Sequence, residues 1–230
     1  MYLPRIALCL GACLVSAAAA QGAIPYADGA GMDFSWTNAE DDNGYFGQPF
    51  ASGASNLIYF PLSSFLAEAD SLHQQDNVAD QLRMDLFANS GLAFESVTFV
   101  ARGEYEIDSA EAGSASVAAS GNVMLTALAG QPLDPGSDTA SYSFFADSPT
   151  GGTIPWDETL MITIPLTKAV SALHVVADQE NIAIAADGTS SILTNFQIIG
   201  IELGVGIPEP ASISLLLFGG AALVCRRRRG

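Results

Sequence analysis

The sequence predicts an all-β protein: an antiparallel β-sandwich or jelly-roll-like domain, flanked by an N-terminal signal-peptide helix and a short C-terminal transmembrane helix. From Leu57 onward, apolar and polar side chains alternate over many short stretches, which is the pattern of half-buried strands. Gly, Asn, Asp and Ser separate these stretches, as they do in the turns of all-β folds. A continuous apolar run at each end sets the expected division into residues 1–20, 21–206 and 207–230.

The first ambiguous segment of the domain runs from Leu62 to Ala79. Its apolar residues have helical spacing, but the polar residues 74–77 continue a helix poorly. We therefore expect strands and a loop here rather than a helix.

Later stretches alternate with period two and predict strands with one buried face. Their apolar positions are Leu82, Met84 and Leu86; Val97, Phe99 and Ala101; Tyr105 and Ile107; Ala115, Val117, Ala119, Val123, Leu125 and Ala127; Tyr142, Phe144 and Ala146; and Leu160, Ile162, Ile164 and Leu166. Asn89-Ser90-Gly91 predicts a turn. Gly121 predicts either one long strand or a bent pair. The stretch from Leu173 to Leu203 contains Asp187-Gly188 and predicts a hairpin.

The N-terminal segment has the three parts of a secretory signal peptide. One arginine precedes an apolar run from Ile6 to Val15, and small residues follow. Ala18 and Ala20 fit the A-x-A rule for signal peptidase, so the mature chain is expected to begin at Gln21. A lipoprotein signal ending at Cys13 is the alternative, but it leaves a shorter apolar core.

The C-terminal segment combines a proline-flanked glutamate, an apolar run and a basic cap. Pro208, Glu209 and Pro210 prevent a helix from starting before the run and leave an extended strip. The run Ala211–Cys225 has 15 residues. It spans about 22 Å as a helix, short of a bilayer core of about 30 Å. The cap of Arg226, Arg227, Arg228 and Arg229 favours the cytoplasmic side, which leaves the domain outside.

This tail resembles the PEP-CTERM sorting signal in its tripeptide, run length, basic cap and terminal position. The resemblance implies a Gram-negative-type envelope and delivery to the cell surface or extracellular matrix. It also implies processing by a membrane enzyme called exosortase. It covers about 24 residues and implies no activity for the domain. An ordinary single-pass anchor is the alternative.

A second resemblance concerns the domain itself. The runs Asp33–Trp36, Asp42–Gly47, Phe94–Thr98 and Gly103–Tyr105 are similar to mature domains of other PEP-CTERM proteins. That resemblance implies one β-rich domain without an assigned activity.

Composition restricts the partners of the domain. Between Gln21 and Ile207, 24 acidic residues stand against three basic ones, Arg83, Arg102 and Lys168, which gives a formal charge of −21. Such a surface repels phosphate backbones, so nucleic-acid binding is not expected. All three cysteines lie in the end segments, so the domain is expected to fold without a disulfide.

No catalytic motif is present in the sequence. His73 and His174 have no metal-ligand spacing, and neither a G-x-S-x-G elbow nor a phosphate-binding glycine loop occurs. Glu104 and Glu106 share a strand face that should point to solvent, so we do not expect a pair of glycosidase carboxylates there. We expect no enzyme activity; a secreted hydrolase is the least favoured alternative.

One segment suggests a hard cation. Asn38, Glu40, Asp41 and Asp42 place oxygen ligands before Gly44, as in loops that bind calcium. The EF-hand template fails, since its first and last ligand positions would be Ala39 and Phe50. We expect no cofactor, with a solvated turn favoured over a calcium loop.

Trp36 and Trp156 are the two indoles that could stack on sugar rings, but a buried aromatic cluster explains them more readily. The prediction is a surface or matrix protein of structural or adhesive role. Its expected partners are signal peptidase, exosortase, the inner membrane before processing and exopolysaccharide. A carbohydrate-binding module, with or without calcium, is the alternative.

Overall fold

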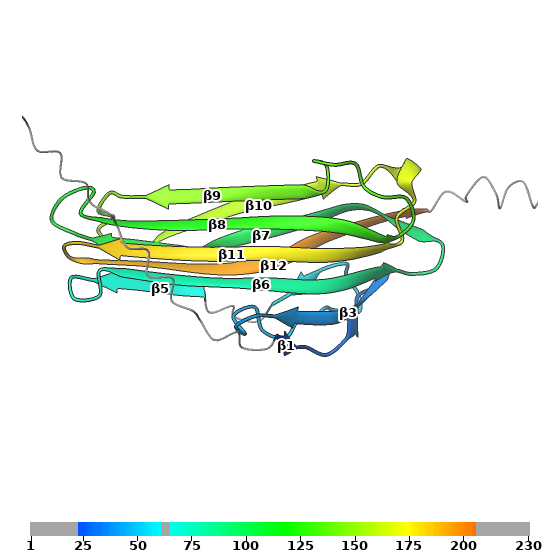
Figure 1. Ribbon diagram of the computed structural model, residues 1–230, viewed down its shortest axis with the longest axis horizontal. Coiled ribbons are helices and arrows are strands. Elements are labelled where there is room, and N and C mark those ends of the chain that lie inside the picture. The colour runs from blue at the N-terminus through cyan, green and yellow to red at the C-terminus, as the bar shows by residue number, and fades with distance from the viewer. Residues whose placement is uncertain (1–22, 61–64, 206–230) are drawn as a thin grey trace, which may run out of the picture.

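The computed structural model describes residues 23–60 and 65–205, which form an elongated β-sandwich (Figure 1). The predicted flanking helices, the signal-peptidase residues and the sorting residues 208–210 and 226–229 lie outside the described residues. The strands are β1 (Ile24–Pro25), β2 (Gly29–Ala30), β3 (Phe34–Asp41), β4 (Ile58–Tyr59), β5 (Phe65–Asp70), β6 (Gln75–Ala88), β7 (Leu92–Asp108), β8 (Ala115–Ala129), β9 (Thr139–Ala146), β10 (Ile154–Thr163), β11 (Ala172–Ala185) and β12 (Thr189–Val205). A short 3₁₀ helix, η1, covers Leu166–Lys168.

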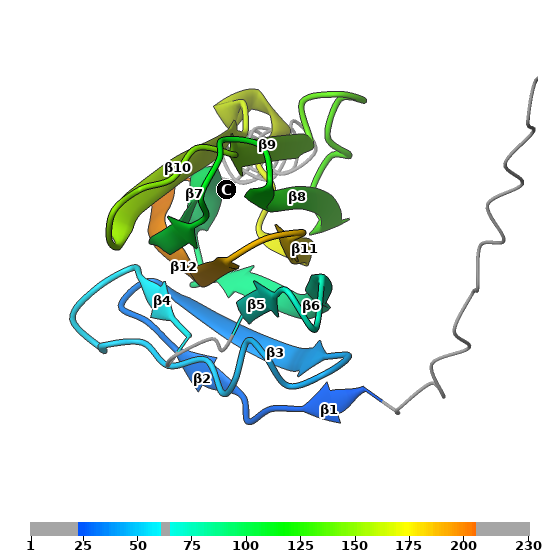
Figure 2. The same cartoon turned by 90° about the vertical axis from the view of Figure 1, so that its left-hand side faces the viewer.

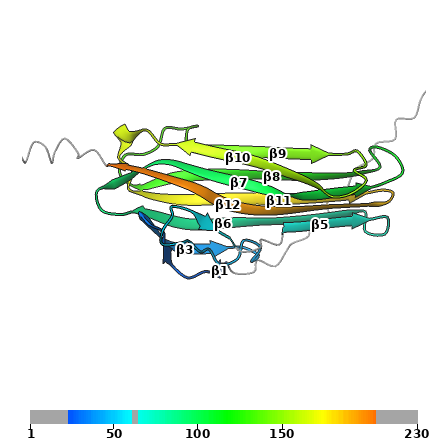
Figure 3. The ribbon, with the colours of Figure 1, turned by 180° about the vertical axis from the view of Figure 1, so that it is seen from behind.

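All strands pair antiparallel in two sheets. Sheet A has the order β1-β3-β6-β11-β8-β9, with β2 also on β3. Sheet B has the order β10-β7-β12-β4, with β5 also on β12. The end-on view separates the two layers (Figure 2), and the view from behind shows β7 and β12 running the length of the molecule (Figure 3). The predicted antiparallel sandwich is therefore confirmed.

The chain changes sheet at most of its turns, and this overturns one prediction. Asp187-Gly188 is a turn, with Gly188 at φ 78°, but it does not close a hairpin. β11 before it pairs with β6 and β8, whereas β12 after it pairs with β7. The turn therefore leads from sheet A to sheet B. β11 and β12 do not pair with each other, because each forms its hydrogen bonds with other strands.

Alternation located most of the strands correctly. β6 buries Leu82, Met84 and Leu86 as predicted. Of the segment 62–79, the described residues 65–79 form β5, a turn and the start of β6, with no helix. The strand predicted to reach Leu166 ends instead at Thr163. Pro165 has no N–H to donate to a sheet ladder, so the strand ends just before it.

The core lies between the two sheets and is rich in phenylalanine. Phe34, Phe46, Phe65, Phe94 and Phe99 are all fully buried. The rings of Phe46 and Phe65 meet edge-on with centroids 4.9 Å apart, the geometry that aromatic quadrupoles favour. These large side chains pack in one cluster with aliphatic residues from both sheets.

Strand β3 was not predicted, and it includes most of the acidic segment 38–42 that was expected to be a loop or turn. Asn38, Glu40 and Asp41 belong to this strand rather than to a loop. The pairing of β3 with β6 shifts register between Thr37 and Glu40, and Asn38 has a positive φ of 53°. This bulge breaks the period-two pattern, which is why alternation did not show the strand.

Candidate functional site

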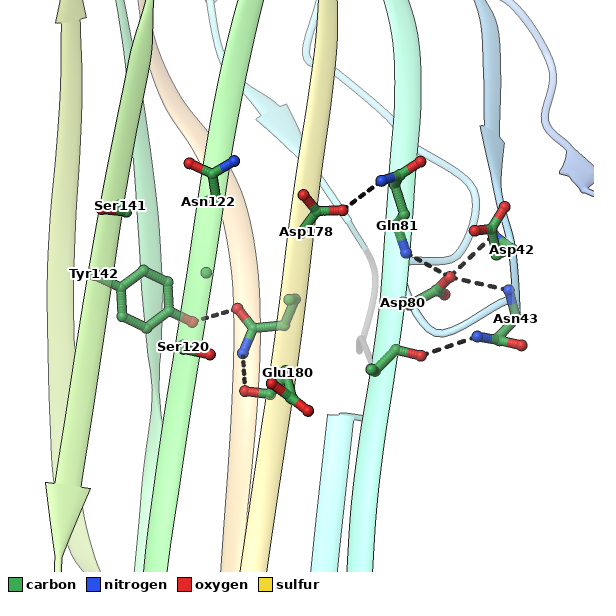
Figure 4. Close-up of a pocket in the computed structure, with 13 residues that line it drawn as sticks. Asp42, Asn43, Asp80, Gln81, Ser120, Asn122, Ser141, Tyr142, Asp178 and Glu180 are labelled. Carbon is green, nitrogen blue, oxygen red and sulfur yellow. Dashed lines mark hydrogen bonds between the residues drawn. The ribbon is translucent and has the colours of Figure 1, made fainter. Parts of the chain in front are cut away.

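A shallow depression of about 630 Å³ crosses the middle of sheet A (Figure 4). Its lining comes from the turn that follows β3 and from β6, β11, β8 and β9. Five segments far apart in sequence therefore contribute to one surface.

A row of polar side chains runs across this depression. The strand register places Gln81 beside Asp178, Asp178 beside Asn122, and Asn122 beside Ser141. The Gln81 side-chain amide donates to a carboxylate oxygen of Asp178 over 2.5 Å. Neighbouring strands are about 4.8 Å apart, so the row presents amide, carboxylate and hydroxyl groups at regular spacing. Sequence parity places each residue on the outer face, but only the register shows that they align.

Beneath the row, a chain of buried polar side chains links the two sheets. The Tyr142 hydroxyl donates to the side-chain carbonyl of Gln179, whose amide donates to Asn181 over 2.9 Å. Thr194, on β12 of sheet B, donates to the same Asn181 oxygen over 2.8 Å. Burial raises the pKa of Tyr142, so its hydroxyl keeps its proton and stays a donor. Because each buried polar group here has a partner, the network fixes how β9, β11 and β12 lie together.

Gly121 makes room for this network. A side-chain carbon at that position would lie 2.3 Å from the Tyr142 ring. β8 is one continuous strand through Gly121, which decides between the two predicted alternatives. Only glycine leaves space for the Tyr142 ring to lie against β8 and reach Gln179.

Two buried carboxylates hold the turn at the rim. Asp80 accepts backbone N–H groups from Asp42 and Asn43, both over 3.0 Å, and from Tyr45 over 2.9 Å. Asp41 accepts from the backbone of Gly44 and Phe46 and from the Tyr26 hydroxyl; the distances are 2.9, 3.1 and 2.7 Å. Burial, with the nearby Asp41 charge, raises the pKa of Asp80 above its ordinary 3.8. These carboxylates therefore shape residues 42–47 by accepting their N–H groups.

The four residues of the candidate calcium loop do not converge on one point, because each has a partner of its own and two of them share Arg83. Asn38 donates to Asp85 over 2.8 Å, Asp41 is buried, and Asp42 binds Arg83 through two contacts of 2.7 and 3.3 Å. Glu40 lies 3.8 Å from the same guanidinium. Within residues 23–60 and 65–205, no three His, Cys, Asp or Glu side chains cluster as metal ligands would. The absence of a cofactor, with a solvated turn favoured over a calcium loop, stays a prediction.

Both tryptophans belong to the core. Trp36 is 3% exposed and its indole N–H donates to the Ala27 carbonyl over 3.3 Å. Trp156 is 6% exposed and stacks on Phe144 at 5.0 Å and 12°. The indole N–H of Trp156 has no acceptor among the described residues. The predicted aromatic cluster is confirmed, and neither ring forms an exposed platform for sugar.

Both histidines pair with aspartates on the surface. His174 contacts Asp85 at 2.7 Å on the outer face of sheet A, and neither residue lines the depression. His73 lies 3.4 Å from Asp70 in the turn before β6. Glu104 and Glu106 are exposed on β7, as predicted. The residues that line the depression include no histidine, cysteine or lysine.

The comparison with protein families finds a match in the C-terminal tail. Residues 206–229 match the family described as the PEP-CTERM protein-sorting motif. The chain carries a PEP-CTERM sorting motif. The motif implies export, a membrane-anchored precursor, sorting to the cell surface and an exosortase as processing partner. In the part of the chain that the structure describes, no helix has the length and apolarity needed to cross a membrane.

Comparisons of the domain give only distant resemblances, and no curated protein matches the chain. It is similar to the enzymatically active domain of bacteriophage CBA120 tailspike protein 4, with 11% identity and a TM-score of 0.27 over 74% of this chain; it spans only 19% of that protein. It is similar to a cowpea mosaic virus empty particle, with 12% identity, a TM-score of 0.28 and coverage of 64% and 87% of the two chains. It is also similar to the carbohydrate-binding module TmCBM61 in complex with β-1,4-galactotriose, with 10% identity, a TM-score of 0.25 and coverage of 75% and 88%. These values support no functional inference.

Proposed function

We propose that the protein is a non-enzymatic, structural or adhesive component of the cell surface or extracellular matrix of a bacterium with a Gram-negative-type envelope. The sorting motif at residues 206–229 is the observation that carries this proposal. Signal peptidase acts before Gln21, the tail then holds the precursor in the inner membrane, and exosortase processes it.

Two features of the domain support a role without catalysis. The lining of the depression has hydroxyls and carboxylates but includes no histidine, cysteine or lysine, and histidine is the side chain that most often acts as a general base. The strongly acidic domain suits a hydrated matrix, where its charge keeps chains soluble and attracts divalent cations.

Mass spectrometry of the protein from its native host tests the proposal. We expect a species that begins near Gln21 and ends near Pro208 in the extracellular fraction. Glu209→Ala should leave precursor that keeps the arginine cap. A wild-type protein that retains residues 226–229 in the membrane would show that the tail is a lasting anchor, and normal processing of the variant would refute the role of Glu209.

A second candidate function is binding of a neutral exopolysaccharide in the depression. The row from Gln81 to Ser141 is the observation that favours it, since regularly spaced amide, carboxylate and hydroxyl groups suit the hydroxyls of a sugar chain. The buried tryptophans count against the stacking mode of sugar binding, so hydrogen bonds would supply the recognition.

Calorimetry with purified host exopolysaccharide, with and without calcium chloride, tests this candidate. Replacing Asn122 and Ser141 together by alanine should weaken binding at least tenfold. The matched control is Asn195→Ala, on the outer face of sheet B, which should bind as wild type does. Absence of binding by the wild-type protein would remove the candidate, and binding only with calcium would support the alternative in which calcium assists carbohydrate binding.

A further inference from the structure

Strand β9 forms an edge of sheet A that lacks the protection found on the other edges. It pairs only with β8 among the described strands. Its sequence, TASYSFFA, has no charge, proline or glycine, and its register with β8 is unbroken. Proteins usually protect edge strands with charges, prolines, bulges or short length.

The other edges show such protection. β10, at the edge of sheet B, contains Pro155, Asp157 and Glu158. β1, β2 and β4 have two residues each, and β5 carries Glu68 and Asp70. β9 is therefore the one long edge strand of the described sheets that offers an uncharged backbone template.

The distribution of charge points to a second copy of the same chain as the partner. The 15 residues of β8 and the 8 residues of β9 contain no charged side chain, in a segment with a formal charge of −21. Elsewhere on the surface two copies repel each other, whereas this strip has no such barrier. It also exposes apolar side chains: Phe145 is 63% exposed and Leu128 is 51% exposed.

The inner side of β9 is held rigidly, so the edge is already arranged for pairing. Phe144 stacks on Trp156, and the Tyr142 hydroxyl donates to Gln179. A strand that needs no ordering when it binds keeps more of its interaction energy.

We infer that two copies of the domain associate by antiparallel pairing of β9 with β9, which joins their A sheets into one. In a twofold register centred on Ser143, Ser141 lies opposite Phe145 and Tyr142 opposite Phe144 of the second copy. The acidic neighbours of the strand, Asp138 and Asp147, then lie opposite Ser148 and Thr139, so no carboxylate faces another. The inference goes beyond the sorting role and does not depend on it.

Sedimentation velocity of the mature exported protein over about 2–200 µM tests this association, since a small interface gives a weak dimer. We expect a monomer–dimer equilibrium that strengthens with salt, because salt screens repulsion between the acidic surfaces. Ser143→Asp should weaken it at least tenfold by placing like charges opposite each other. Thr126→Asp adds the same charge to the outer face of β8, beyond the part of β8 that pairs with β9, and should leave the dimer intact.

Cross-linking tests the register. The exported domain has no cysteine between Gln21 and Ile207, so Ser143→Cys should form a disulfide-linked dimer under mild oxidation, and Thr126→Cys should not. A wild-type protein that stays monomeric throughout the range overturns the inference, as does a Ser143→Asp variant that dimerises as strongly as wild type. Circular dichroism of each variant checks that it is folded. A monomer that is still exported and processed normally would refute the dimer and leave the sorting role intact.

Discussion

The turn at residues 42–47 gives a quantitative prediction for Asp80→Asn. Oδ1 of Asp80 accepts the N–H groups of Asp42, Asn43 and Gln81, and Oδ2 accepts that of Tyr45. The asparagine amide keeps one acceptor oxygen, which can take the place of Oδ1. Its NH₂ group then faces the Tyr45 N–H, so that hydrogen bond is lost. Losing one bond to a charged acceptor costs about 1.5–3 kcal/mol. Removing the repulsion between Asp80 and Asp41 offsets part of this cost. We therefore expect the free energy of unfolding to fall by about 2 kcal/mol.

Urea and thermal unfolding of the mature protein at pH 7 measure this change. A loss of about 2 kcal/mol corresponds to roughly 4–8 °C in Tm for a domain of this size. Asp157→Asn removes the same charge from an exposed position of β10 and should stay within about 0.5 kcal/mol of wild type.

The pH dependence provides a second test. Because the folded state raises the pKa of Asp80 above 3.8, it holds this proton more tightly than the unfolded chain does. The contribution of Asp80 to stability is therefore full below about pH 4 and decreases as the pH rises through the raised pKa. The gap between wild type and Asp80→Asn should be wider at pH 4.5 than at pH 8. A variant as stable as Asp157→Asn at both pH values would refute the view that this carboxylate anchors the turn.

Two further predictions concern backbone space and the buried network. Gly188→Ala places a side-chain carbon at φ 78° and 1.9 Å from the Asp108 carbonyl oxygen. It should lower the free energy of unfolding in urea by about 3 kcal/mol. The control Gly53→Ala has open space around it and should lower that free energy by less than about 1 kcal/mol. Tyr142→Phe leaves the Gln179 carbonyl without its donor and should lower stability by about 1–2 kcal/mol; an unchanged urea midpoint would show that water or another donor replaces the hydroxyl.

The sequence was most informative where burial alone decides structure. The alternation of Leu82, Met84 and Leu86 indicates one buried face. It predicted the strand because a buried face can be recognised without knowing which strands lie beside it. The same reasoning correctly kept Glu104 and Glu106 on the solvent side of β7.

The alternation of apolar and polar residues does not show which strand lies beside which. Asp187-Gly188 has the chemistry of a tight turn whether the chain returns to the same sheet or crosses to the other one. The row of Gln81, Asp178 and Asn122 depends on the register of three strands that are distant in sequence, so no local pattern could reveal it. Asp41 and Asp80 look like surface acids in the sequence, because their burial depends on N–H groups that only the folded turn supplies.

The position of β12 has a mechanical consequence. The strand ends at Val205, paired with Leu92, and Pro208 follows three residues later in the sequence. Tension applied through the tail therefore acts along the direction of β12, while its hydrogen bonds to β7 lie across that direction. Under such a shear load, many hydrogen bonds must break together. While the tail anchors the precursor, the domain should therefore resist a force applied through the tail. A force applied across β9 or β10 would meet less resistance, because there the hydrogen bonds would open one at a time.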